Sequence, residues 1–274
     1  MIYVENKSGE IKPEPTMGRI ERARLGLLDY IQINIREPFV EGGENLPNYP
    51  CVVATSHLSD VDVLAVVRAI MGVDQRKIGI SSQKTNFDLS LPAMKLAGLD
   101  NFFPLQNTVQ KNGHASFTLS LPDFERMRDG ITKERRTMVI AGHVPTRNWK
   151  LHRNAGIGPV LLAHMANVPL VPAVVDIMSL APVAQSTMTL KERALRLIKG
   201  ERPSAKIIFG KPMTFPEISE EKLKAIFNLY GLKRENIDEE EWATIALFKQ
   251  EQKAMMLSLA ANLPSKKRGV WDRA

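Results

Sequence analysis

The stretch CVVATSHLSDVD, residues 51–62, determines how the rest of the sequence is interpreted. Residues 51–55 are apolar or small and predict a short buried strand, whereas residues 61–71 predict a helix that Gly72 ends. The polar segment between them is therefore a loop that leaves a strand and enters a helix. Ser59 suits the N-cap of that helix, since a hydroxyl oxygen can accept from its first free amides.

The same alternation of strands and helices continues outward from this stretch. Further strands are predicted at residues 77–81, 137–141, 170–175 and 205–209. Further helices are predicted at residues 17–35, 91–97, 115–128 and 157–166, and again from residue 219, where residues 239–262 are the longest stretch. This order predicts an α/β fold: a mixed central sheet flanked by helices, with helical N- and C-terminal extensions.

No shift in composition marks a domain boundary. Residues 1–16 are polar and contain Pro13 and Pro15, so we expect a flexible arm followed by a single domain over residues 17–274. Apolar residues make up 44% of the 274 residues, enough for a substantial core. The single cysteine, Cys51, excludes an internal disulfide and a cysteine metal cluster, and its place beside an apolar strand favours a buried packing role.

Charge and hydropathy restrict the location and the partners. The formal net charge of +7 favours an anionic membrane, a phosphorylated substrate, an acidic carrier protein or nucleic acid. No run of about 20 apolar residues is present, and the start lacks the apolar core of a signal peptide. We therefore expect a cytoplasmic protein that is attached to a membrane at most peripherally.

His57 and Asp62 are the candidate catalytic pair. Helical residues turn by about 100° each, so five positions on one helix would place the two side chains roughly 140° apart. They can meet only if His57 lies in the loop and Asp62 in the first helical turn. A competing interpretation is structural, because Ser59-x-x-Asp62 resembles a capping box and a carboxylate suits a helix start. Both interpretations stay open from the residues alone.

The motif His57-Leu-Ser-Asp-Val-Asp62 is similar to the His-x4-Asp signature of the glycerolipid acyltransferase family. Other family blocks are matched in order over about residues 50–271: Ser82-Gln-Lys84, Gly98 to Phe103, Met138 to Arg147, Gly156 to Val174, and Ile208-Phe-Gly-Lys-Pro212. The resemblance implies an O-acyltransferase that transfers a fatty acyl chain from a thioester donor to the hydroxyl of a glycerolipid phosphate or related amphiphile.

The resemblance also implies roles for individual residues and partners. His57 would be the general base and Asp62 its partner, and Thr146, Arg147, Ser59 and Lys84 would bind substrate. The donor would be acyl-CoA or an acyl-carrier protein, and neither a bound cofactor nor a metal is implied. The remaining partners would be a lipid-like acceptor and an anionic membrane surface. Nucleic acid is not expected, because no binding module is recognisable.

Several positions depart from the family pattern. In the third block Val144 and Pro145 replace a glutamate and a glycine, and the second block continues Pro104-Leu-Gln106 without its usual arginine. These losses put the usual acceptor in doubt. They also motivate an alternative, a non-catalytic lipid-binding relative that kept the fold. His143 stands where the family has proline; a structural role is the favoured interpretation, and a place in the site is the alternative.

Three basic segments have two possible roles each. Residues 17–35 form an amphipathic pattern with arginines, residues 191–202 contain five basic side chains, and residues 265–271 combine basic residues with a tryptophan. Each is either an ordinary solvated or core-packed segment or a contact with lipid headgroups.

Overall fold

In the computed structural model, the described residues form one mixed sheet of seven strands in the order β1-β7-β6-β2-β5-β3-β4. The structure describes residues 38–58, 62–73, 76–83, 102–105, 119–143, 150–177, 205–229 and 238–273. The strands are β1 (Phe39–Glu41), β2 (Val52–Thr55), β3 (Ile78–Gln83), β4 (Phe102–Leu105), β5 (Thr137–Ala141), β6 (Leu170–Ile177) and β7 (Ala205–Phe209).

Strand β2 lies at the centre of this sheet. It pairs in parallel with β6 on one side and β5 on the other, and the parallel order continues through β3 to β4. The direction reverses once, because β7 pairs antiparallel with β6 and β1 then runs parallel to β7. All four residues of β2 are buried, which agrees with its apolar residues Val52 to Ala54, and the strand ends at the buried Thr55. The predicted mixed sheet is confirmed.

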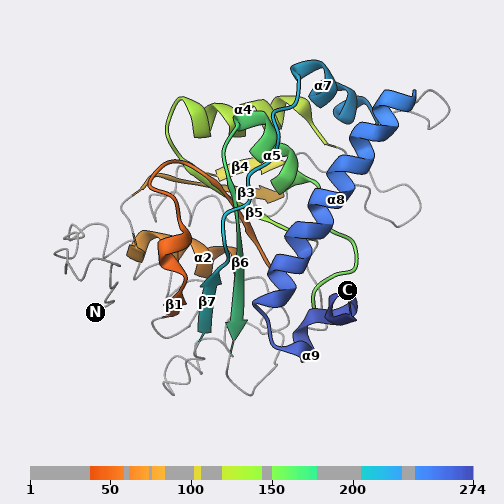
Figure 1. The fold of residues 1–274 in the computed structure, drawn as a ribbon. Coiled ribbons are helices and arrows are strands. Elements are labelled where there is room, and N and C mark those ends of the chain that lie inside the picture. The colour runs from red at the N-terminus through yellow and green to blue at the C-terminus, as the bar shows by residue number, and fades with distance from the viewer. Residues whose placement is uncertain are drawn as a thin grey trace.

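Helices cover both faces of the sheet (Figure 1). The described helices are α2 (Asp62–Val73), α4 (Leu121–Thr132), α5 (Gly158–Ala166), α7 (Glu220–Leu229), α8 (Glu239–Ala261) and α9 (Ser265–Arg268), with 3-10 turns η2 (Gly43–Asn45) and η5 (Gly269–Arg273). One buried apolar cluster joins α2 to its face of the sheet, and another joins α4, α5, α7 and α8 to the opposite face. The sheet is thus the middle layer of three.

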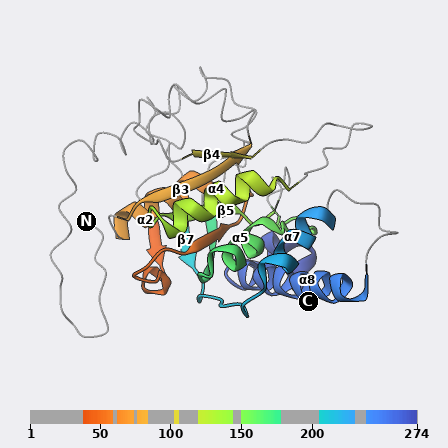
Figure 2. The same ribbon diagram turned by 90° about the horizontal axis from the view of Figure 1, so that it is seen from above.

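Helix α4 differs from the sequence prediction. A helix was predicted over residues 115–128, whereas the described helix begins at Leu121 and extends to Thr132. Pro122 explains the later start, since proline lacks an amide hydrogen and is best placed in the first turn of a helix, where that donor has no partner. Helix α4 packs on the edge strand β4 and against α5, and α5 separates it from α8 on the same face of the sheet (Figure 2).

Helix α8 confirms the predicted C-terminal helical extension and is the longest described helix. It begins with a capping box: the Asp238 carboxylate accepts from the Glu241 amide at 2.7 Å, and the Glu241 carboxylate accepts from the Asp238 amide at 3.1 Å. Its buried residues, including Phe248, Met255 and Leu259, pack on the sheet side. The predicted helices at residues 17–35 and 91–97 and the predicted arm at residues 1–16 lie outside the described residues.

Among the described residues, no helix has the length and apolar character needed to cross a bilayer.

Candidate active site

The candidate site lies where β2 and β5 end. Thr55, the last residue of β2, pairs with Ala141, the last residue of β5, so the segments that follow both strands emerge side by side. The Gly142 amide extends this pairing by donating to the Thr55 carbonyl at 2.8 Å. His57 follows β2 by two residues, and His143 follows β5 by two residues. In open α/β sheets, ligands bind at this carboxyl edge of the strands.

His57 and Asp62 occupy the positions that helix geometry requires for a contact between them. His57 is half-buried and lies in the loop after β2, whereas Asp62 is the first residue of α2 and has no exposed surface. The predicted placement of His57 in the loop and Asp62 in the first helical turn is therefore confirmed. The predicted end of the helix at Gly72 is wrong, because α2 continues through Gly72 to Val73. A hydrogen bond between the imidazole and the carboxylate stays a prediction.

The carboxylate of Asp62 is bonded to both neighbours of His57. Its Oδ2 accepts from the Leu58 amide at 2.7 Å and from the Ser56 hydroxyl at 3.4 Å. The Ser56 oxygen in turn accepts from the Val175 amide of β6 at 3.2 Å. Asp62 thus holds the loop that precedes its own helix, and these hydrogen bonds fix the carboxylate beside the backbone of His57. The capping box predicted with Ser59 stays a prediction, because Ser59 lies outside the described residues.

His143 contacts the backbone of His57 from the neighbouring strand end. Its Nε2 accepts from the His57 amide at 3.1 Å, and the residue is only 3% exposed. A bridge to Ala155 holds the backbone of His143 in place. The structure places the ring of His143 against the backbone of His57, a contact that fits the favoured structural role and lies next to the candidate base. The sequence contained one indication of this contact, because His143 follows the strand at residues 137–141 by two residues, as His57 follows the strand that ends at Thr55.

Ser56 was not singled out from the sequence. A buried serine beside an apolar strand has no distinctive pattern, and only the fold shows that its hydroxyl links β6 to Asp62. The predicted substrate-binding residues are Ser59, Lys84, Thr146 and Arg147, and all four lie outside the described residues.

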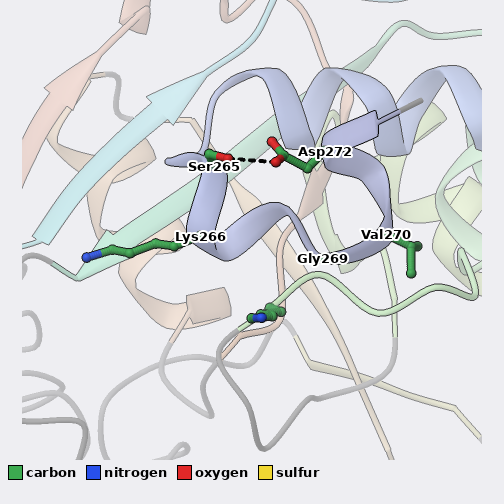
Figure 3. A pocket seen from close by; sticks show the side chains of 6 residues that line it. Ser265, Lys266, Gly269, Val270 and Asp272 are labelled. Atoms are coloured by element: carbon green, nitrogen blue, oxygen red, sulfur yellow. Dashed lines mark hydrogen bonds between the residues drawn. The ribbon is translucent and has the colours of Figure 1, made fainter.

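A surface pocket of about 590 Å³ lies at the C-terminal end of the chain (Figure 3). It is lined by Lys150, Ser265, Lys266, Gly269, Val270 and Asp272. The Ser265 hydroxyl donates to the Asp272 carboxylate at 2.6 Å across the turn. The Lys267 ammonium reaches Asp176 at 2.5 Å, and Asp176 lies near the carboxyl end of β6. The C-terminal turn therefore packs at the same edge of the sheet as His57.

A second polar pair lies between α5 and α8. His164 Nε2 and Glu251 Oε2 are 2.7 Å apart, and their side chains are 1% and 10% exposed. The His164 ring stacks on Phe215 and contacts Phe248. His164 also lines a small pocket of about 190 Å³ next to Pro169, which precedes β6 and so marks the opposite edge of the sheet from His57. This pair therefore belongs to the packing of the two helices.

Cys51 is fully buried at the start of β2. Burial raises the pKa of its thiol to about 11, an effect that the nearby Arg76 only partly opposes. The expected packing role is consistent with this position, because a buried neutral thiol is a poor nucleophile. Among the described residues, no three His, Cys, Asp or Glu side chains are grouped closely enough to hold a metal ion.

Comparison with known proteins gives a structural similarity. No known family model matches the chain, and no curated protein is significantly similar to it in sequence. In backbone arrangement it is similar to the crystal structure of the 1-acyl-sn-glycerophosphate (LPA) acyltransferase PlsC from Thermotoga maritima, with a TM-score of 0.44 and 16% sequence identity. The similarity covers 78% of this chain and 81% of that chain.

Proposed function

We propose that this protein is an O-acyltransferase that moves a fatty acyl chain from a thioester donor to the hydroxyl of a glycerolipid phosphate or related amphiphile. The observation that carries the proposal is the placement of His57 and Asp62 at the carboxyl edge of the sheet. A half-buried histidine stands in a loop whose two flanking residues are bonded to a fully buried aspartate.

In this mechanism His57 is the general base. A hydroxyl is a weak nucleophile at neutral pH, and an imidazole with an ordinary pKa of about 6.5 can take its proton during attack. The acceptor oxygen then bonds to the thioester carbonyl carbon, the carbon–sulfur bond breaks, and the sulfur leaves as a thiol with the proton that His57 carried. A carboxylate at the position of Asp62 would orient the imidazole and stabilise the transient imidazolium.

The donor would be acyl-CoA or an acyl-carrier protein, and the positive net charge suits either of these acidic partners. Thr146 and Arg147 would bind the acceptor, since a guanidinium can hold two phosphate oxygens at once. Ser59 and Lys84 would contribute to the same substrate site. The reaction would take place at an anionic membrane surface, where the acceptor resides, and it would need no resident cofactor.

The alternative is a non-catalytic lipid-binding relative. The missing glutamate of the family's third block, whose position holds Val144, and the missing arginine of its second block favour it. The two candidates predict the same acceptor binding but differ in turnover, so a single assay separates them.

The test is acyl transfer measured with both donor types and a panel of phosphorylated and neutral lipid acceptors. Turnover by the wild-type protein, lost by roughly 10²- to 10⁴-fold in His57→Ala, would support the proposal. Asp62→Asn should also lower turnover, because it removes the negative charge while keeping an oxygen for the Leu58 amide.

His152→Ala is the matched control, since the His152 ring makes local contacts, with the backbone of Asn154. Wild-type turnover in His57→Ala would rule out the mechanism. Tight acceptor binding without any turnover by the wild type would favour the non-catalytic relative.

A further inference from the structure

Two consecutive amides at the candidate base are held by buried side chains from different elements. The His57 amide donates to Nε2 of His143 at 3.1 Å, and the next amide, of Leu58, donates to Oδ2 of Asp62 at 2.7 Å. One acceptor follows β5 and the other begins α2. The peptide units on both sides of the His57 Cα are therefore tied to the frame of the fold.

The direction of the first hydrogen bond fixes the protonation state of His143. A backbone amide can only donate, so the ring nitrogen opposite it must be an acceptor and carries no proton. This hydrogen bond therefore predicts the neutral tautomer of His143, with its proton on Nδ1. A protonated Nε2 would place two donors against each other in a position that is 97% buried from solvent, given the 3% exposure of the residue.

The backbone of His143 and of the preceding residue is held by contacts with other segments. The His143 backbone is bridged to Ala155, and the preceding Gly142 donates to Thr55 and accepts from the Gly156 amide at 2.7 Å. A Cβ added to Gly142 would lie 3.2 Å from a methyl of Leu259 in α8, so a side chain there would require that methyl to move by a few tenths of an ångström. The ring of His143 therefore stands on a part of the backbone that several elements hold in place.

We propose that His143 is a positioning residue, which fixes the backbone of His57 so that the imidazole meets the acceptor hydroxyl and Asp62. The proposal rests on the proposed acyl transfer and adds a residue to it that does not touch the reacting atoms. It also removes two candidates for the oxyanion site. The amides of His57 and Leu58 already donate to side chains, so other groups must stabilise the charge that develops on the thioester oxygen.

Three variants of His143 separate positioning from simple packing. Glutamine can place an acceptor where Nε2 lies, phenylalanine fills the volume without an acceptor, and alanine does neither. His143→Phe and His143→Ala should lower kcat by roughly 10- to 100-fold with a smaller change in KM, because small misplacements of a catalytic group carry costs of this size. His143→Gln should stay within a few-fold of the wild type, as should the control His152→Gln.

Wild-type kcat in His143→Phe would overturn the proposal, and so would a loss in His143→Gln as large as in His143→Phe. Circular dichroism and thermal unfolding identify any variant that does not fold, and such a variant is set aside in favour of NMR on the wild type. With ¹⁵N-labelled histidine, Nε2 of His143 should have the shift of an unprotonated nitrogen and a scalar coupling to the His57 amide.

The NMR measurement also separates the two proposals. If the wild type transfers no acyl chain to any acceptor but the coupling is present, the proposed function fails and the positioning of the His57 backbone stands. A protonated Nε2 at neutral pH, with no coupling to the amide, would overturn the role of His143 whatever the activity.

Discussion

At the scale of single residues, Asp62 has a structural role in the loop before its own helix, in addition to the proposed catalytic role. A buried carboxylate loses its hydration, and only hydrogen bonds and nearby charge offset that cost. The bonds from Leu58 and Ser56 provide part of this compensation and simultaneously define the shape of the loop. The structural role and the proposed catalytic role are therefore compatible, because the hydrogen bonds that stabilise the buried carboxylate also keep it next to His57.

Arg147 provides a test of the acceptor at the same scale. If the acceptor carries a phosphate, Arg147→Ala should raise its KM strongly, since a charge-assisted hydrogen bond contributes roughly 1.5 to 3 kcal/mol, or about 10- to 150-fold. The measurement compares KM for a phosphorylated acceptor and its dephosphorylated form. The dephosphorylated form should respond little, because it lacks the group that the guanidinium would bind.

The control for this comparison is Arg153→Ala. Arg153 is an exposed arginine that follows the 144–149 segment in the sequence. An equally small effect of Arg147→Ala on both acceptors would exclude Arg147 as a phosphate ligand. That result would favour a neutral acceptor or the non-catalytic relative.

At the scale of elements, the pair His164–Glu251 should stabilise the packing of α5 against α8. Glu251→Ala leaves the buried imidazole without this partner, and we expect it to lower the free energy of unfolding by about 1–3 kcal/mol. Glu251→Gln should cost less, because the amide can still bond to Nε2. Denaturant unfolding of both variants measures the difference.

Lys253→Ala is the matched control for this prediction, because Lys253 is exposed on the same helix. Exposed substitutions of this kind usually change stability by less than about 0.5 kcal/mol. If Glu251→Ala were as stable as Lys253→Ala, the buried pair would contribute nothing to the contact between the helices.

Helices and strands could be predicted from the sequence where the pattern of apolar and turn residues agrees with how the segment packs in the fold. The strands at residues 137–141 and 205–209 match the prediction residue for residue, since each is a short apolar run between turn residues. The start of α4 was placed too early because helical periodicity continues upstream of Pro122 while the proline sets the first turn. The reversal of direction at β7 was not predicted, because strand direction depends on which strands become neighbours.

The candidate site was predictable only in part, because some of its contacts depend on which strands become neighbours. His57 and Asp62 are close in sequence, so helix geometry alone could place one in the loop and the other in the first turn. His143 and Ser56 acquire their roles through strand pairing. The contacts of these residues with His57 and Val175 join positions 86 and 119 apart in the chain, which no local pattern encodes.

At the scale of the whole molecule, the net charge of +7 predicts binding to anionic membranes. The exposed Lys266, together with Val270, which is 63% exposed, lies at the same edge of the sheet as the candidate site. Each lysine or arginine near an anionic surface contributes about 1 kcal/mol. We expect sedimentation with vesicles that contain an anionic lipid and much weaker sedimentation with vesicles of neutral phosphatidylcholine.

Salt provides the control for this prediction. Raising NaCl from about 0.1 M to about 1 M shortens the Debye length from about 10 Å to about 3 Å, so the bound fraction should fall steeply. Equal binding to neutral and anionic vesicles, unaffected by salt, would exclude an electrostatic contact and leave apolar insertion as the cause.

Because Cys51 is buried next to the central strand β2, the rate at which a thiol reagent labels it measures how often that strand opens. The thiol is 0% exposed, its pKa is raised to about 11, and it is the sole cysteine of the chain. A thiol reagent can react only after β2 has separated from its neighbours, because the neutral, enclosed sulfur is both inaccessible and unreactive. The labelling rate in native buffer therefore reports how often the sheet that carries His57 opens, with no engineered probe, and a bound substrate that fastens the loop to the sheet would slow it.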